Sequence, residues 1–206
     1  MVVPATLVQT VVSAYGQSPR AYHGADHIVE VLAQWRSVAA GPGWQQPRET
    51  WLALLFHDAV YEAGRRDNEA MSAALARHEL EAHLEKLGID IERVCTLIEL
   101  TARHGRLGLA DVDSDAALML DCDMAILGAS EERFDAYDAA IAEEYRDVLP
   151  AWMFRFNRRR FLKHLLGLDR IFLSDFFHER LDAPARANLR RAIGRGRTAL
   201  AAGAGR

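Results

Sequence analysis

The sequence predicts a single all-α domain, and three observations support this fold class. Nearly every segment between glycine or proline residues has apolar side chains spaced for one face of a helix. No run alternates apolar and polar residues, and no Asn-Gly pair offers a tight hairpin turn, so we expect no strands. The chain has 206 residues, of which 50% are hydrophobic, and this is enough for one domain with its own core.

The apolar spacing predicts nine helices, and the breaks between them have local causes. The segment 41–43, Gly-Pro-Gly, cannot continue a helix, whereas Pro150 can open one because a first-turn proline loses no hydrogen bond. Asp182 precedes Ala183 and Pro184 and is the expected N-cap of the last helix. The expected helices cover residues 4–15, 25–39, 48–62, 67–87, 90–104, 113–127, 130–147, 151–167 and 183–200.

One folded domain is expected over residues 1–193, followed by a flexible basic tail over residues 194–206 that is rich in glycine and alanine. Cys95 and Cys122 are the only cysteines and form no C-x-x-C pair, so we expect neither disulfide bonds nor a thiolate metal site. The N-terminal segment lacks the basic start of a signal peptide, and the longest purely apolar run elsewhere, residues 51–56, is too short to cross a bilayer. We therefore expect a cytoplasmic protein without membrane contact.

The formal net charge is −4 and the sequence pI is about 6.1, which disfavours a nucleic-acid binder that depends on overall positive charge. The charges are unevenly placed. Residues 111–147 contain twelve acidic side chains and two arginines, whereas residues 186–206 contain six arginines and no acid. The first segment can carry or flank a cation site, and nucleic acid is a minor alternative for the second.

His57 and Asp58 are the most informative pair of residues. They lie in a segment, residues 51–61, that is apolar almost all round and is therefore expected to be central. A charged Asp58 in such a place needs a partner, which is either a buried ion pair or a metal ion. From these two residues alone, both alternatives stay open.

Two further segments carry potential ligand side chains. His23 and His27 are four residues apart and would share a helix face if the helix reached back past Gly24; otherwise each is a loop or first-turn residue. Asp121 and Asp123 stand in an apolar run, but positions two apart point in different directions around a helix, so we expect only one of them to be a ligand.

Taken together, these residues predict a metal site. Helical bundles build such sites from side chains that project inward from facing helices. Two imidazoles and two carboxylates leave open coordination positions, which suits Mn, Fe, Co, Ni or Mg and tolerates Zn. Open positions are also what metal-assisted hydrolysis requires.

The order of these residues, a histidine, a His-Asp pair and a distant aspartate on an all-α chain, resembles the HD-domain superfamily of metal-dependent phosphohydrolases. The likeness is close to an uncharacterised bacterial branch of predicted HD phosphohydrolases of similar length, and it extends over residues 15–193. The residues that carry it are Tyr22-His23, His27-Ile28, residues 56–61, Asn68-Glu69, Ser72-Ala73, Thr101, His104, residues 121–128, Tyr137, Glu144-Tyr145, Ile171-Phe172 and residues 185–188.

The resemblance implies a helical bundle of the HD-domain type that binds one divalent metal ion. It places Asp123, rather than Asp121, at the last ligand position, because Asp123 directly precedes the apolar run 124–127. The implied metal ligands are His27, His57, Asp58 and Asp123.

Other histidines are candidates for a second metal ion. His104 lies where some members of the superfamily place a histidine for a second metal or for the substrate phosphate. His78 and His83 could complete such a site, but they lie on a helix face rich in Ala and Glu, where a solvated role is expected. One metal ion is therefore favoured.

The implied reaction is hydrolysis of a phosphate ester or anhydride, either a nucleotide or a small phosphomonoester, by a water that the metal ion activates. The expected catalytic residues are Glu62, His104 and Asp58. Glu62 would share a helix face with Asp58, four residues before it, and is the first candidate for the general base; the alternative is an exposed charge at a helix end. The arginines near these motifs, which are candidates for binding the phosphate but can equally be surface residues, are Arg20, Arg65, Arg66 and Arg103.

Two other functions stay open. A two-iron oxygenase of the same superfamily would need His104 and one more histidine as ligands. A non-catalytic helical module would bind a nucleotide or a partner protein in the same pocket. A homodimer is also possible, because the apolar segment 171–177 can either contact a second chain or pack inside the domain.

Overall fold

The computed structural model describes residues 4–17, 20–84 and 87–203, and these residues form nine α-helices, several short 3₁₀ helices and no strand. The prediction of an all-α fold is therefore confirmed. The α-helices are α1 (Ala5–Tyr15), α2 (Ala25–Ala40), α3 (Pro47–Phe56), α4 (Asn68–Leu84), α5 (Ile91–Leu100), α6 (Ser114–Met124), α7 (Glu131–Glu144), α8 (Ala151–Leu166) and α9 (Asp175–Gly203). The 3₁₀ helices include η2 (Thr101–Arg103) and η4 (Ala125–Gly128), which continue directly from α5 and α6, and η3 (Leu109–Asp111).

Side-chain caps begin several of these helices. Asp90, Asp113 and Ser130 precede α5, α6 and α7, and each accepts a hydrogen bond from the backbone N–H three residues further on. Such caps satisfy N–H groups that have no partner inside the helix. Most observed helices begin and end within a few residues of the predicted bounds, and the third and last helices are the main exceptions.

The third helix is shorter than predicted. α3 ends at Phe56, so the prediction that it continues to residue 62 is wrong. Side chains at the start of α4 replace the missing helical hydrogen bonds: Ser72 Oγ bonds both the N–H (3.0 Å) and the C=O (3.1 Å) of Val60. The Asn68 side chain likewise accepts from the N–H of Glu62 (3.0 Å) and donates to its C=O (2.9 Å). The chain after Phe56 is therefore fixed as a turn against α4.

The last helix begins earlier than predicted, at Asp175, and it contains Pro184. The prediction that Asp182 is an N-cap is wrong, because this residue lies inside α9. Its carboxylate accepts hydrogen bonds from the N–H of Ile171 (2.8 Å) and from Nε of Arg186 (2.5 Å). Asp182 thus ties α9 to the segment that precedes it.

The apolar segment 171–177 packs inside the domain. Ile171, Phe172 and Phe177 are all buried, so these side chains need no second chain to cover them. At the other end, α9 continues to Gly203, three residues beyond the predicted end of the last helix, and the flexibility expected of the tail stays a prediction. Residues 204–206 of the expected tail lie outside the described residues.

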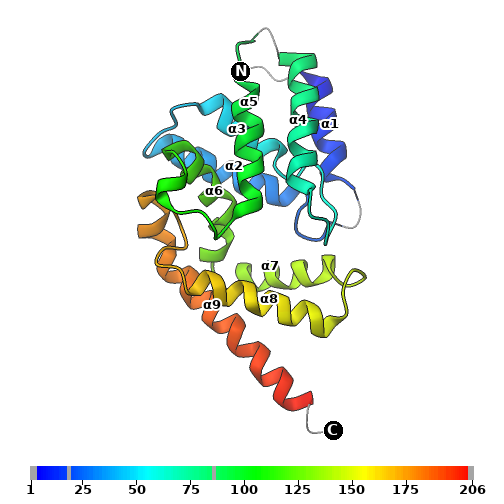
Figure 1. Ribbon diagram of the computed structural model, residues 1–206, viewed down its shortest axis with the longest axis vertical. Helices are drawn as coiled ribbons and strands as arrows, with labels where there is room; N and C mark the ends of the chain where they lie inside the picture. Colours follow the sequence, from blue (N-terminus) through cyan, green and yellow to red (C-terminus); the bar gives the residue numbers. More distant parts are fainter. Residues whose placement is uncertain (1–3, 18–19, 85–86, 204–206) are drawn as a thin grey trace.

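Figure 1 shows α1 to α6 as the larger part of the molecule, with α7 and α8 beneath it and α9 packed on α8 and extending toward the C-terminus. α3 packs against α2, α4, α5 and α6, which makes it the central helix. Leu52, Leu54 and Phe56 of α3 are 0% exposed. The residues that directly follow α3 therefore start in the middle of the core. No described helix is both long and apolar enough to cross a membrane.

Candidate metal centre

Three elements bring the predicted ligands together. His27 lies in the first turn of α2, His57 and Asp58 directly follow α3, and Asp123 is the next-to-last residue of α6. Because α3 packs against both α2 and α6, its C-terminal end faces the other two ligand positions. The structure thus gathers all four side chains that the sequence points to, and their role as ligands stays a prediction.

The donor atoms of these side chains converge. Nε2 of His27 lies 3.1 Å from Nε2 of His57. Asp123 Oδ1 is 3.2 Å from the first nitrogen and 3.4 Å from the second, and Asp58 Oδ2 is 3.5 and 3.1 Å from them. Ligand atoms that share one ion at about 2.0–2.2 Å lie roughly 3.0–3.5 Å from one another. The spacing of the His27, His57 and Asp123 atoms therefore fits a single divalent cation, and Asp58 lies beside both imidazoles of this group.

The burial of the four side chains is uneven. The His27 and His57 side chains are each 1% exposed, whereas those of Asp58 and Asp123 are 15% and 17% exposed. The Nδ1 of His57 bonds the carbonyl oxygen of Leu54, but the buried Nδ1 of His27 has no partner among the described residues. The imidazoles thus form the floor of the site, and the carboxylates lie nearer to the surface.

Opposite charges set the protonation of this cluster. Burial disfavours each charged form, but the neighbouring groups outweigh it: the pKa values of Asp58 and Asp123 lie well below their ordinary range beside His57. For His57 and His27, burial acts to lower the pKa, and the two carboxylates raise it above the ordinary value. Protons on the imidazoles therefore balance the carboxylates, and a divalent cation can take over that role.

The structure separates the two candidate aspartates of α6. Asp123 points into the cluster, whereas the buried Asp121 accepts hydrogen bonds from the N–H groups of Leu173 (2.8 Å) and Ser174 (2.7 Å) and from the Ser174 hydroxyl (2.6 Å). Burial raises the pKa of Asp121 to about 6, and these hydrogen bonds oppose that rise. Asp121 thus anchors the segment before α9 to α6, and it is not part of the cluster.

His104 lies beside the cluster, and the role that the resemblance implies for it stays a prediction. It follows η2, and its Nε2 is 2.7 Å from Oδ2 of Asp123. Asp123 therefore presents one oxygen to the two imidazoles and the other to His104. The His104 side chain is 17% exposed, so a substrate can reach it.

Glu62 is placed differently from the expectation. Because α3 ends at Phe56, Glu62 does not share a helix face with Asp58, and that argument for a general base is wrong. The Glu62 side chain is 75% exposed and lies 3.9 Å from a guanidinium nitrogen of Arg65. The structure favours the alternative, an exposed surface charge.

The four arginines predicted to bind phosphate have different surroundings. Arg20 donates to the carbonyl oxygens of Asp58 (2.7 Å), Ala59 (3.0 Å) and His23 (3.2 Å), and so ties the His23 turn to the segment after α3. Arg65 is paired with Asp67 at 2.6 Å. Arg66 and Arg103 are exposed. A role in binding phosphate stays a prediction for all four.

The structure also contains an arrangement that the sequence did not predict. His23 lies in the turn before α2, and its Nδ1 is 2.7 Å from Oε2 of Glu144 at the end of α7. The helix does not reach back to His23, so His23 and His27 do not chelate an ion as a helical pair. His23 and Glu144 are both among the residues that carry the resemblance, but no local pattern predicts their contact, because they lie far apart along the chain.

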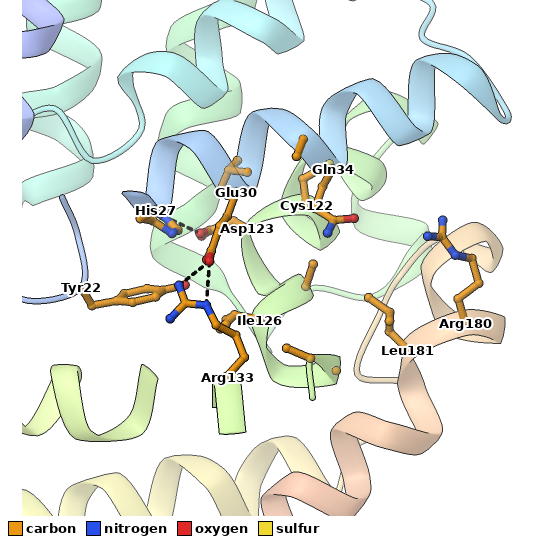
Figure 2. Close-up of a pocket in the computed structure, with 15 residues that line it drawn as sticks. Tyr22, His27, Glu30, Gln34, Cys122, Asp123, Ile126, Arg133, Arg180 and Leu181 are labelled. Atoms are coloured by element: carbon orange, nitrogen blue, oxygen red, sulfur yellow. Dashed lines mark hydrogen bonds and ion pairs between the residues drawn. The ribbon is translucent and has the colours of Figure 1, made fainter. Parts of the chain in front are cut away.

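Two cavities open onto the cluster. The first, called here the α2–α9 cavity, has a volume of about 280 Å³ and includes His27 and Asp123 in its wall (Figure 2). An ion pair between Glu30 and Arg133 lies beside these two residues, as Figure 2 shows. Both side chains of the pair are 39% exposed. This cavity is therefore polar on the side that faces the cluster.

The second, called here the α7–α8 cavity, has a volume of about 440 Å³ and is bounded by His23, His104 and Asp123. Its remaining wall is largely apolar, with Asn157 and Arg158 as its polar members, and its aromatic residues are Tyr22, Tyr61, Tyr137, Tyr145, Phe154 and Phe161. A volume of this order is typical of pockets for small molecules. The α7–α8 cavity thus joins the polar cluster to an apolar chamber.

No family model matches this sequence, and neither a curated protein nor a solved structure matches it. The donor set, its burial and the two cavities beside it are therefore the observations that bear on the function.

Proposed function

We propose that this protein is a metal-dependent hydrolase of a phosphate ester or anhydride, with a nucleotide or a small phosphomonoester as substrate. The observation that carries the proposal is the convergence of two imidazole nitrogens and two carboxylate oxygens where two cavities open. This donor set suits a divalent cation with open coordination positions. The resemblance of the motif order to HD-domain phosphohydrolases supports phosphate chemistry.

The proposed ligands are His27, His57, Asp58 and Asp123. The carbonyl oxygen of Leu54 holds Nδ1 of His57, so that Nε2 of His57 faces the cluster. His104 holds Oδ2 of Asp123, so that Oδ1 of Asp123 faces the cluster. A divalent ion in this site would lower the pKa of a water and withdraw charge from the phosphoryl oxygens. His104 also lines the α7–α8 cavity, and in this proposal the ring nitrogen that does not hold Asp123 donates a hydrogen bond to a phosphoryl oxygen.

A site for one ion is better supported than a two-iron oxygenase centre. Among the described residues, the cluster that includes His27, His57 and Asp123 is the group of three ligand side chains gathered around an ion-sized space. His78 is exposed on α4, and His83 lies 3.7 Å from Glu79 of the same helix. Of the three histidines considered for a second ion, His104 therefore lies beside the cluster, and His78 and His83 do not.

Elemental analysis tests the proposal directly. The parent protein, purified without chelator and without an affinity-column metal, is expected to hold about one divalent ion per chain. His57→Ala and Asp58→Ala are expected to hold almost none. Matched controls are His78→Ala and Asp26→Asn, which change exposed residues, the second of them directly beside a proposed ligand. A hydrolysis screen with several divalent ions and phosphate esters follows on the same samples.

Each outcome decides between functions. One ion together with phosphate release that both ligand variants abolish supports the hydrolase. Two irons per chain would replace it with the oxygenase. No metal in the parent, even after reconstitution with Mn, Co, Ni, Fe and Zn, would exclude both enzymes and favour a binding module, which nucleotide binding by metal-free protein would then support.

A further inference from the structure

His23 and Glu144 form an imidazole–carboxylate pair at the wall of the α7–α8 cavity. The Glu144 side chain is 0% exposed, whereas that of His23 is 18% exposed. Besides the contact with His23 Nδ1, the Glu144 carboxylate accepts hydrogen bonds from the N–H groups of Tyr22 (2.8 Å) and His23 (2.9 Å) and from the Tyr61 hydroxyl (2.9 Å). With four donors around it, Glu144 cannot move without losing several hydrogen bonds.

This pair determines which nitrogen of His23 a ligand can reach. The Glu144 carboxylate can only accept, so Nδ1 of His23 carries a proton and donates it. The ring stacks on Tyr61, with 4.0 Å between ring centroids and 28° between planes, which restricts its rotation. No described residue bonds Nε2 of His23. A fixed imidazole therefore has one nitrogen available on the side of the cavity.

The cavity surroundings indicate what this nitrogen meets. The wall runs from Asp123 and His104 of the candidate metal centre, past His23, to the aromatic side chains of Tyr145, Phe154 and others on and around α7 and α8. A phosphoryl group at the metal centre would place its ester oxygen near the start of this wall and its alcohol part in the aromatic chamber. The cation in this wall, Arg158, is paired with Asp138 and lies over the rings of Tyr137 and Phe161, so the chamber is mostly apolar. In such surroundings water is a poor source of the proton that a departing alkoxide needs.

We propose that His23 is the general acid of the hydrolysis proposed above, that Glu144 is its positioning residue, and that the α7–α8 cavity holds an aromatic or other apolar alcohol as the leaving group. This inference rests on the proposed function. The P–O bond to the alcohol breaks with its electron pair going to oxygen, which takes the proton from Nε2 of His23. A water oxygen forms the new bond to phosphorus. The proton that this water loses passes to solvent, from which His23 regains one.

Two aryl phosphates test the assignment. Their leaving groups are rings of similar size, and only one of these leaving groups needs a proton in order to depart. Phenyl phosphate releases a basic phenolate, whereas 4-nitrophenyl phosphate releases a phenolate that is stable without protonation. For His23→Gln, kcat is expected to fall roughly 100-fold or more with phenyl phosphate and less than about tenfold with 4-nitrophenyl phosphate. The metal content of the same samples is expected to equal that of the parent.

A second variant keeps the test independent of folding. Tyr61→Phe removes one hydrogen bond to Glu144 and retains the ring that stacks on His23. Its kcat is expected to fall less than that of His23→Gln, and again more with phenyl phosphate than with 4-nitrophenyl phosphate. His78→Gln, at an exposed position on α4, is the matched control and is expected to match the parent with both esters.

The contrary outcomes are distinct from one another. Equal losses with both esters in His23→Gln would overturn the general-acid role, and loss of metal from that variant would make His23 a ligand instead. A parent that hydrolyses other phosphate esters but neither aryl ester would overturn the leaving-group assignment alone. A metal-loaded parent that hydrolyses no phosphate ester would overturn the proposed function and this inference with it.

Discussion

His57 Nδ1 lies 2.8 Å from the carbonyl oxygen of Leu54, an oxygen that would accept from the N–H of Asp58 if α3 continued. The N–H of Asp58 instead bonds the hydroxyl of Tyr15 at 3.2 Å. The end of α3 therefore does two things at once: it frees a carbonyl to orient His57, and it places Asp58 beside the imidazoles. The arrangement of the four proposed ligands depends on the helix ending at Phe56.

Tyr15→Phe is expected to weaken this arrangement. The buried N–H of Asp58 would lose its partner, which costs about 1–3 kcal/mol of unfolding free energy, and it would compete with His57 for the Leu54 carbonyl. We therefore expect lower stability together with weaker metal binding, measured by chemical denaturation and by competition with a chelator. Phenylalanine fills nearly the same volume, so packing is conserved. Unchanged metal affinity in a destabilised variant would show that Tyr15 acts on folding alone.

Metal binding is expected to release protons. The raised pKa values of His57 and His27 and the lowered values of Asp58 and Asp123 mean that the imidazoles hold protons while the carboxylates stay charged. A cation must displace those protons, so below the raised histidine pKa values the apparent affinity rises with pH, and above them it levels off. Calorimetric titrations in two buffers with different ionisation enthalpies count the released protons.

The calorimetric result has a clear control. His57→Ala removes one imidazole from the cluster, and it is expected to lose both the binding heat and its dependence on the buffer. If the heat measured with the parent protein were independent of the buffer at every pH, the metal-free cluster would not hold the protons assigned to it, and the imidazoles would be neutral.

Asp121 and Asp123 are expected to give opposite results when each is changed to asparagine. Asp121→Asn puts an NH₂ group against the N–H and O–H donors of Leu173 and Ser174, so we expect a loss of about 1–3 kcal/mol in unfolding free energy with the metal retained. Asp123→Asn removes a proposed ligand charge, so the metal is expected to be lost. Thermal unfolding and elemental analysis on both variants distinguish the two roles. Loss of metal from Asp121→Asn alone would reverse the assignment.

Helix periodicity and local caps were enough to predict the all-α fold and most helix bounds, because these signals lie within each segment. The early end of α3 was not predictable in this way, since the partners that replace its hydrogen bonds, Ser72 and Asn68, come from the next helix. The same holds for α9, where Pro184 resembles a helix start although Asp182 is held by Ile171. Local patterns cannot show partners that only the folded chain brings together.

The candidate site follows the same rule. His57, Asp58 and Asp123 were candidates because they are polar residues in apolar segments. The full set of four, with His27 and with Asp123 in place of Asp121, was implied by the resemblance, and their role as ligands stays a prediction. The contact between His23 and Glu144 was not predictable, although the sequence points to both residues, because only the packing of α7 near the His23 turn joins them. Glu62 failed for the opposite reason: its spacing from Asp58 is informative only on a helix that in fact ends earlier.

Gly128 is expected to be essential for packing α9 against η4, the short helix that follows α6. It ends η4, which follows the helix that carries Asp123, and a Cβ at this position would lie 2.7 Å from Cβ of Leu181 and 3.0 Å from its carbonyl oxygen. Backbone atoms cannot give way as a flexible side chain can. Gly128→Ala is therefore expected to lower the unfolding free energy by about 1–3 kcal/mol, measured by denaturant titration.

Gly194→Ala is the matched control because it lies in the same helix as Leu181, and among the described residues a Cβ there meets no atom within 4 Å beyond the nearby backbone of its own helix. Alanine favours a helix over glycine by up to about 1 kcal/mol, so this variant is expected to be as stable as the parent or more stable. Opposite shifts of the denaturation midpoint in the two variants would locate the effect in the contact with Leu181. If Gly128→Ala unfolded at the same denaturant concentration as the parent, α9 would not pack on η4 in solution as closely as the structure describes.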